Sequence, residues 1–273
     1  MTPLFKSLVA AAVLAAPLQG AAQAQSGIGD LLVAPTRIVL DGRRGTEVIL
    51  NNIGSEPATY RISVEFRRMT KDGGLEEVAE PSETDKLARD MIVYAPRRIT
   101  LAPRQPQAVR IAARPPKGMA DGEYGVHLLF RGIPPAKPVV SADEPVKGLR
   151  FALTPVYGVT TPVIVRLGNL EAKAGIANVH LDTRDGKQAV ALDLTRSGER
   201  STFGEVRVLK PGVEDPIASQ RAVAVYTELD TRRVAIPIDE RFAGDVRGPV
   251  TVQYVERFED GSRTLAETQA VLR

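Results

Sequence analysis

The sequence predicts an all-β protein built from two sandwich domains, and two observations lead to this fold class. Apolar and polar residues alternate in many short runs, which places one face of each run against a core. Turn signals rich in Gly, Pro, Asn and Asp separate these runs at intervals of about 8 to 15 residues, a spacing typical of antiparallel sandwiches. The chain of 273 residues is long enough for about two such domains.

The strands are predicted from this alternation. It is clearest at residues 59–67, where Tyr60, Ile62 and Val64 alternate with Arg61, Ser63 and Glu65. Similar runs predict further strands near residues 124–130, 149–153, 190–194, 206–208, 234–238 and 250–254. Residues 83–91 are the one candidate helix, and their polar surroundings favour a loop with a single helical turn.

Two interruptions divide the predicted strands. Residues 134–148 contain four prolines, so they cannot pair continuously in a sheet and are expected to form a long loop. A second break falls at Thr160, Thr161 and Pro162, after which residues 163–167 are expected to start a new series of strands. The sequence therefore predicts one sandwich over residues 25–160 and another over residues 161–273.

Residues 1–24 have the features of a secretory signal peptide. Lys6 precedes an apolar run over residues 8–18, and Ala22 and Ala24 provide the small side chains of a cleavage site. The run is too short to span a hydrocarbon core of about 30 Å. We expect export through a Sec-type pathway, with cleavage after Ala24.

The composition excludes several classes of function. Without cysteine, the chain can form no disulfide, thiolate nucleophile or Cys-based zinc site. His127 and His180 are the two histidines, which is too few for a His-based metal site, so neither a metal nor a cofactor is expected. The 36 basic and 33 acidic residues nearly balance, and the short Arg pairs lack interleaved aromatic residues, so no nucleic-acid partner is expected. Acid pairs such as Glu76-Glu77 fit solvated turns better than a catalytic cleft.

Four stretches of the first domain carry a family resemblance. The most specific features are Thr36-Arg37 followed by Asp41-Gly42, the segment 96–110, and a strand that ends on Ile133-Pro134. In this order and spacing, the chain resembles the periplasmic pilus-assembly chaperones of the chaperone-usher pathway, the PapD-like family. The second domain matches only as another cysteine-free immunoglobulin-like sandwich. The resemblance implies two immunoglobulin-like domains set at an angle, with a cleft between them, in the periplasm.

The resemblance also implies a function without catalysis. Members of this family bind incomplete pilin-like subunits, lend them a missing strand, and deliver them to an outer-membrane usher. Here the donated strand would be residues 147–157, with Leu149, Phe151 and Leu153 filling the subunit's groove. The alternation alone favours these three residues lying in the chain's own core; the resemblance and the preceding loop favour donation instead. The same strand offers a route to self-association of the free protein.

A second family feature is a basic cleft that holds the subunit's C-terminal carboxylate. Arg37 occupies the matching position, and a guanidinium suits a carboxylate because its planar fork makes two parallel hydrogen bonds. The alternative for Arg37 is a surface salt bridge. The family's second cation, a lysine, aligns with Gly158, so either another cation such as Arg166 replaces it or Arg37 acts alone.

A different class of function also fits an exported pair of sandwiches. The chain could be a non-catalytic binding module that recognises carbohydrate or forms part of a surface structure. The absence of tryptophan and the aromatic content of 5% count against sugar-stacking platforms, so the chaperone is the favoured hypothesis.

Overall fold

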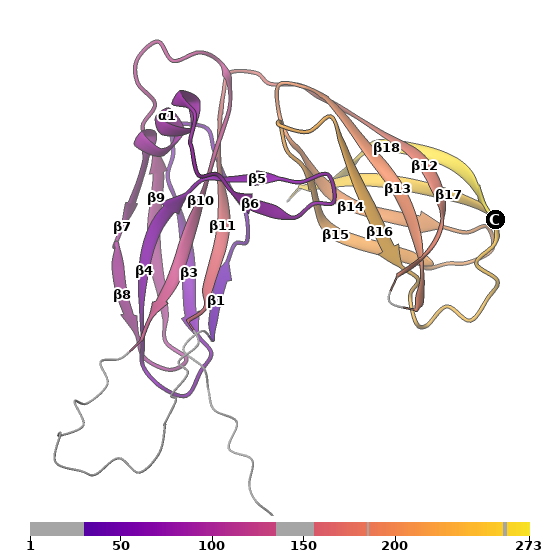
Figure 1. Cartoon of the computed structure of the whole chain (residues 1–273), viewed down its shortest axis with the longest axis horizontal. Coiled ribbons are helices and arrows are strands. Elements are labelled where there is room, and N and C mark those ends of the chain that lie inside the picture. Colours follow the sequence, from indigo (N-terminus) through magenta and orange to yellow (C-terminus); the bar gives the residue numbers. More distant parts are fainter. Residues whose placement is uncertain (1–29, 135–155, 185, 259–260) are drawn as a thin grey trace, which may run out of the picture.

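The computed structural model describes residues 30–134, 156–184, 186–258 and 261–273. Over these residues the chain forms two immunoglobulin-like β-sandwiches set at an angle to each other (Figure 1), so the predicted fold class is confirmed. No helix among these residues combines the length and the apolar character that crossing a bilayer requires.

The first sandwich consists of a four-stranded and a five-stranded sheet. The four-stranded sheet has the order β1 (Leu31–Ala34), β3 (Thr46–Asn52), β9 (Pro106–Ala113) and β7 (Ile92–Ala95). The five-stranded sheet has the order β2 (Ile38–Leu40), β11 (Gly158–Leu167), β10 (Gly122–Ile133), β4 (Ala58–Glu65) and β8 (Arg98–Leu101). The alternation predicted for β4 and β10 is observed, because Tyr60, Ile62, Leu128 and Phe130 are all buried in the core between the sheets.

Strand β11 corrects the predicted course of the chain. It pairs antiparallel with β10 along its whole length, and Val163–Val165 pair in parallel with β2. The expectation that residues 163–167 start a new series of strands is therefore wrong, and the division expected between residues 160 and 161 falls inside β11. Pro162 is tolerated because β2 covers β11 only from Val163 onward, so the proline lies outside the doubly paired part of the strand. The pairing places the division after Leu167.

Residues 83–91, the one candidate helix, form a helix of nine residues rather than the favoured loop with a single helical turn. Helix α1 (Glu83–Met91) begins with a capping box, in which the Ser82 hydroxyl accepts the Asp85 N–H and the Asp85 carboxylate accepts the Ser82 N–H. Ala88 and Met91 lie in the core of the first sandwich. Buried apolar residues at this spacing anchor the helix despite its polar sequence.

The second sandwich has its own core and again consists of two sheets. One sheet has the order β12 (Ala172–Arg184), β13 (Lys187–Gly198) and β16 (Thr231–Pro237). The other has the order β15 (Ala218–Val225), β14 (Thr202–Leu209), β17 (Gly248–Phe258) and β18 (Gly261–Leu272). Every strand predicted from alternation within residues 190–254 overlaps one of these strands, and Ile238 alone of the alternating residues lies just beyond the end of its strand.

A β-hairpin extends from the first sandwich to the second. Strands β5 (Arg67–Met69) and β6 (Leu75–Glu77) form this arm, which crosses the gap between the domains (Figure 1). The Met69 N–H donates to Glu228 Oε1 at 2.9 Å, and the Arg233 N–H donates to the Lys71 carbonyl at 2.6 Å. The arm therefore joins the two domains through backbone groups as well as side chains.

Candidate functional site in the interdomain cleft

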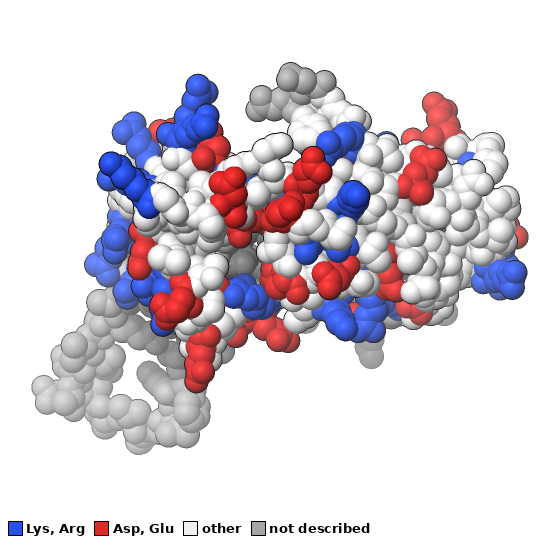
Figure 2. Space-filling model, turned by 90° about the horizontal axis from the view of Figure 1, so that it is seen from above, with Lys and Arg blue, Asp and Glu red and all other residues white. Residues whose placement is uncertain are grey.

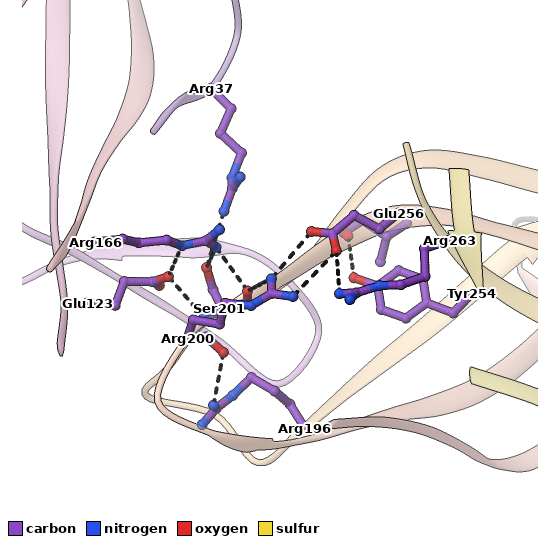
Figure 3. A network of polar contacts seen from close by, with 10 residues as sticks. Arg37, Glu123, Arg166, Arg196, Arg200, Ser201, Tyr254, Glu256 and Arg263 are labelled. Atoms are coloured by element: carbon purple, nitrogen blue, oxygen red, sulfur yellow. Dashed lines mark hydrogen bonds and ion pairs between the residues drawn. The ribbon is translucent and has the colours of Figure 1, made fainter. Parts of the chain in front are cut away.

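Arg37 lies where the first strand of the chain changes sheets. Strand β1 pairs with β3 in one sheet, whereas β2 pairs with β11 in the other, and Arg37 lies in the short connection between them. Its side chain extends across the cleft towards the second sandwich (Figure 3). The sheet change thus places one guanidinium between the domains.

The side chain of Arg37 contacts a serine and a phenylalanine of the second domain. Its Nη2 donates to Ser201 Oγ at 3.2 Å, and its Cζ lies 4.6 Å from the ring centroid of Phe203. Its Nε is buried without a hydrogen-bond partner, and no carboxylate of the described residues forms an ion pair with it. Burial lowers the pKa of Arg37, and the neighbouring positive charge of Arg166 lowers it further. Arg37 is thus a half-buried cation without a direct carboxylate partner among the described residues, although the nearby charges of Glu123 and Glu256 act to raise its pKa.

Arg166 approaches the same serine from β11. Its Nε donates to Glu123 Oε2 at 2.8 Å, and its Nη2 donates to the Ser201 carbonyl at 3.1 Å and to Ser201 Oγ at 3.3 Å. The Ser201 N–H donates to Glu123 Oε2 at 3.0 Å. The guanidinium groups of Arg37 and Arg166 therefore meet at one fully buried residue of the second domain.

The network continues into the second domain. Arg200 pairs with the buried Glu256 at 3.3 Å, and Arg263 contacts the same carboxylate at 3.2 Å (Figure 3). Three arginines of this region pair with two carboxylates, Arg166 with Glu123, and Arg200 and Arg263 with Glu256, while Arg37 lies beside them. Positive charge exceeds negative charge among these six side chains, and such a cleft favours an anionic ligand.

The structure brings together two of the residues singled out in the sequence, Arg37 and Arg166. Gly158 is at the other end of β11, where it pairs with Arg131. Leu149, Phe151 and Leu153 lie outside the described residues. No pattern in the sequence singles out Ser201 and Phe203, because they come from the second domain, where the resemblance gives no residue-by-residue match.

One edge of β11 is open at the end where the predicted donor strand leads into it. Along the described residues, β2 pairs only with Val163–Val165, so Gly158–Pro162 has β10 on one side and no strand on the other. Unpaired backbone groups at such an edge are a template for another chain.

Comparison with protein-family models finds no match, and comparison with the curated proteins finds none either. Solved structures do match. The YadV chaperone is 10% identical, with a TM-score of 0.45, covering 89% of this chain and 100% of that one. The E. coli chaperone DraB is 16% identical, with a TM-score of 0.44, covering 88% and 96%. A chain of the Salmonella enterica complex between the SafA pilin and the SafB chaperone is 14% identical, with a TM-score of 0.43, covering 89% and 97%. At these identities the likeness concerns the fold alone.

Proposed function

We propose that this protein is a periplasmic, non-enzymatic chaperone that binds incomplete pilin-like subunits and delivers them to an outer-membrane usher. The observation that carries the proposal is Arg37, a half-buried cation in the interdomain cleft with no carboxylate partner among the described residues. A guanidinium held in this way is prepared for a carboxylate that arrives from another molecule.

In this proposal Arg37 is the anchor, and the group that it binds is the C-terminal carboxylate of the subunit. Arg37 supplies the first guanidinium, and Phe203 and Ser201 hold its side chain across the cleft. Arg166 is the second cation, because its Nη2 reaches the same Ser201 Oγ that Arg37 contacts. The alternative of a surface salt bridge is disfavoured, since Arg37 is neither fully exposed nor ion-paired within the described residues.

Strand donation is the second element of the proposal. Residues 147–157 lead directly into β11, whose first part has an open edge. A subunit that lacks its last strand would pair with this region, and Leu149, Phe151 and Leu153 would fill its groove. The backbone hydrogen bonds provide affinity, and the alternating side chains provide specificity.

The anchor is tested with Arg37→Ala and a matched control, Arg110→Ala, whose side chain is 85% exposed beside Glu47. Each variant is produced with a pilin subunit from the same source, and the affinity of the purified complex is measured by calorimetry. We expect Arg37→Ala to weaken the complex by more than about 1 kcal/mol, the upper limit for an exposed pair, and Arg110→Ala to leave it unchanged. Equal affinities for the two variants would refute the anchor.

Strand donation is tested separately with Phe151→Glu. A charge inserted into an apolar groove must be desolvated, so the variant is expected to lose the subunit while remaining folded by circular dichroism. A complex that survives this substitution unchanged would show that the subunit binds elsewhere.

A further inference from the structure

Three arginines form a row across the outer face of the five-stranded sheet. Arg131 of β10 lies directly opposite Arg61 of β4, and Arg61 lies directly opposite Arg98 of β8. All three residues are exposed, whereas Ile62 and Phe130, which follow or precede them along the strands, lie in the core. Neighbouring strands are about 4.8 Å apart, so the three guanidinium groups start from one line across the sheet. We call Arg61, Arg98 and Arg131 the arginine row.

The arginine row has no counter-charge among the described residues. None of its three side chains forms an ion pair or a hydrogen bond with them. The acidic residues described on this face, Glu65 and Glu123, are at its other end, towards the second domain. There they pair with Arg67 and Arg166, each at 2.8 Å. In the view from above, Lys and Arg side chains gather on the side of the first sandwich that faces away from the second (Figure 2).

Like charges that lie directly opposite each other across strands destabilise a sheet. The β5–β6 arm of the same chain avoids this cost, because Arg67 lies opposite Glu77 and Arg68 lies opposite Glu76. A soluble surface normally mixes charges of both signs in this way. The arginine row departs from that pattern over three strands, so its balancing charge is expected to come from another molecule.

The residue type and the surroundings of the row indicate the chemistry of that molecule. A guanidinium binds a carboxylate through two parallel hydrogen bonds. In an extended peptide, alternate side chains point to the same side at intervals of about 6.7 Å, which the long arginine side chains can meet. The positions beside the row carry short side chains, namely Ser63, Thr100 and Gly158. An extended chain can therefore reach the guanidinium groups.

An anionic membrane surface is the competing ligand. Protein surfaces that bind membranes combine basic residues with exposed apolar side chains that enter the headgroup region. The apolar neighbours of the row, Leu129 and Ile133, are half-buried. None of the large exposed apolar residues that the structure describes belongs to β4, β8 or β10. The face of the row therefore favours a protein segment over a lipid surface.

We propose that the arginine row binds an extended acidic segment of a partner protein, with carboxylates on alternate residues. The segment would lie across β10, β4 and β8, and its carboxylates would supply the charge that this face lacks. The site uses neither Arg37 nor the donor strand, so it stands or falls independently of the proposed chaperone function.

Binding is tested with the full mature chain and a fluorescein-labelled octapeptide of alternating Glu and Ser, by fluorescence anisotropy. The matched peptide of alternating Gln and Ser should not bind. We expect Arg61→Gln, at the centre of the row, to weaken binding at least about fivefold. Arg247→Gln is the control, because it removes the same charge from an exposed position of the second domain. Failure of the wild type to bind the acidic peptide, or an equal loss in Arg247→Gln, would overturn the site.

The stability of the free protein separates a binding role from a structural one. Arg61→Gln should raise the urea midpoint at about 0.01 M salt, because it removes repulsion from both neighbours. The rise should vanish at about 1 M salt, where the Debye length falls to about 3 Å. A midpoint below that of the wild type would show that the row stabilises the sheet and would overturn the proposal. Tighter binding to phosphatidylglycerol vesicles than to the acidic peptide would overturn the assignment of a protein segment.

Discussion

The imidazole of His127 is buried between the domains, and its charged neighbours come from several elements. Arg67 and Arg68 approach from β5, Asp85 from α1, Glu123 from β10, and Tyr226 and Glu228 from the second domain. The arginines dominate its electrostatic environment, and with burial they lower the pKa from 6.5 to about 4. Protonation of His127 is therefore opposed in the folded state and unopposed in the unfolded chain.

This difference makes the free energy of unfolding depend on pH. Between pH 6.5 and about 4, the unfolded chain binds a proton that the folded protein does not, so stability falls as the pH falls through this window. Across this window the free energy of unfolding of the wild type should fall by about 3 kcal/mol more than that of His127→Leu. Above the window the difference in stability between the two proteins should not change with pH. Urea unfolding of both proteins at about pH 7.5 and about pH 4.5 measures it. The same pH dependence in both proteins would contradict the assignment.

At the scale of residues, the sequence could predict strand faces but not partners across domains. Alternation in β10 placed His127 opposite the core side chains, as observed. The contact of Arg37 with Ser201 joins residues 164 positions apart, and no local pattern encodes such a pair. Arg37 itself was found only through the family resemblance, because one arginine in a turn has no signal of its own.

Among the elements, the β5–β6 arm has the most specific contact with the second domain. The chain turns at Gly73 with φ +83°, and a Cβ built there would collide with the guanidinium of Arg232. Arg233 also forms an ion pair with Asp72 at 3.1 Å. A side chain at position 73 would therefore displace the guanidinium of Arg232, which donates to the Ala224 carbonyl.

We expect Gly73→Ala to release the arm from the second domain. Gly118→Ala is the matched control, since its φ is +78° but no atom lies within 4 Å of a Cβ. Both variants should lose about 1 kcal/mol from backbone strain. Only Gly73→Ala should speed hydrogen exchange at the amides of Met69 and Arg233, which donate across the domains. Unchanged exchange at these amides would show that the arm is held by other contacts.

The sequence predicted part of this arm and missed the rest for a physical reason. Glu76 and Glu77 are exposed in β6, as the prediction of a solvated acid pair requires, but no local pattern indicates which strand pairs with them. In the structure Arg67 lies opposite Glu77, and Arg68 lies opposite Glu76, across the hairpin. The local sequence of helix α1 likewise favours a loop. The helix forms because Ala88 and Met91 are buried in a core that other segments build.

For the whole molecule, Arg166 and Glu123 of the first domain couple the domains because both hydrogen-bond to Ser201 of the second. The Glu123 side chain is 5% exposed, so Arg166→Ala would leave a buried carboxylate without its cation. We expect a loss of about 3 kcal/mol and separate calorimetric transitions for the two sandwiches. Arg184→Ala removes an exposed pair with Asp182 and should change stability by less than about 0.5 kcal/mol. An Arg166→Ala variant that melts like Arg184→Ala would contradict this coupling.

The sequence predicted two sandwiches because each builds its own core from local alternation. The sequence misplaces their division because a proline normally interrupts a strand that is paired on both sides. At Pro162, strand β11 is paired with β10 alone, so the strand continues past the proline. The angle between the sandwiches depends on contacts such as Arg37 with Ser201 and Lys71 with Arg233. Local periodicity carries no information about such contacts.

Three of these contacts have a joint mechanical consequence. The domains meet at Ser201, at the hydrogen bond between Arg233 and Lys71, and at the rings of His127 and Tyr226. Two bodies held at two points can still rotate about the line that joins those points, and the third contact blocks that rotation. Loss of the arm contact would leave a hinge axis through Ser201 and Tyr226, whereas loss of the Ser201 contacts would leave one through Tyr226 and Arg233. Loss of the arm contact and loss of the Ser201 contacts would therefore open the cleft in different directions.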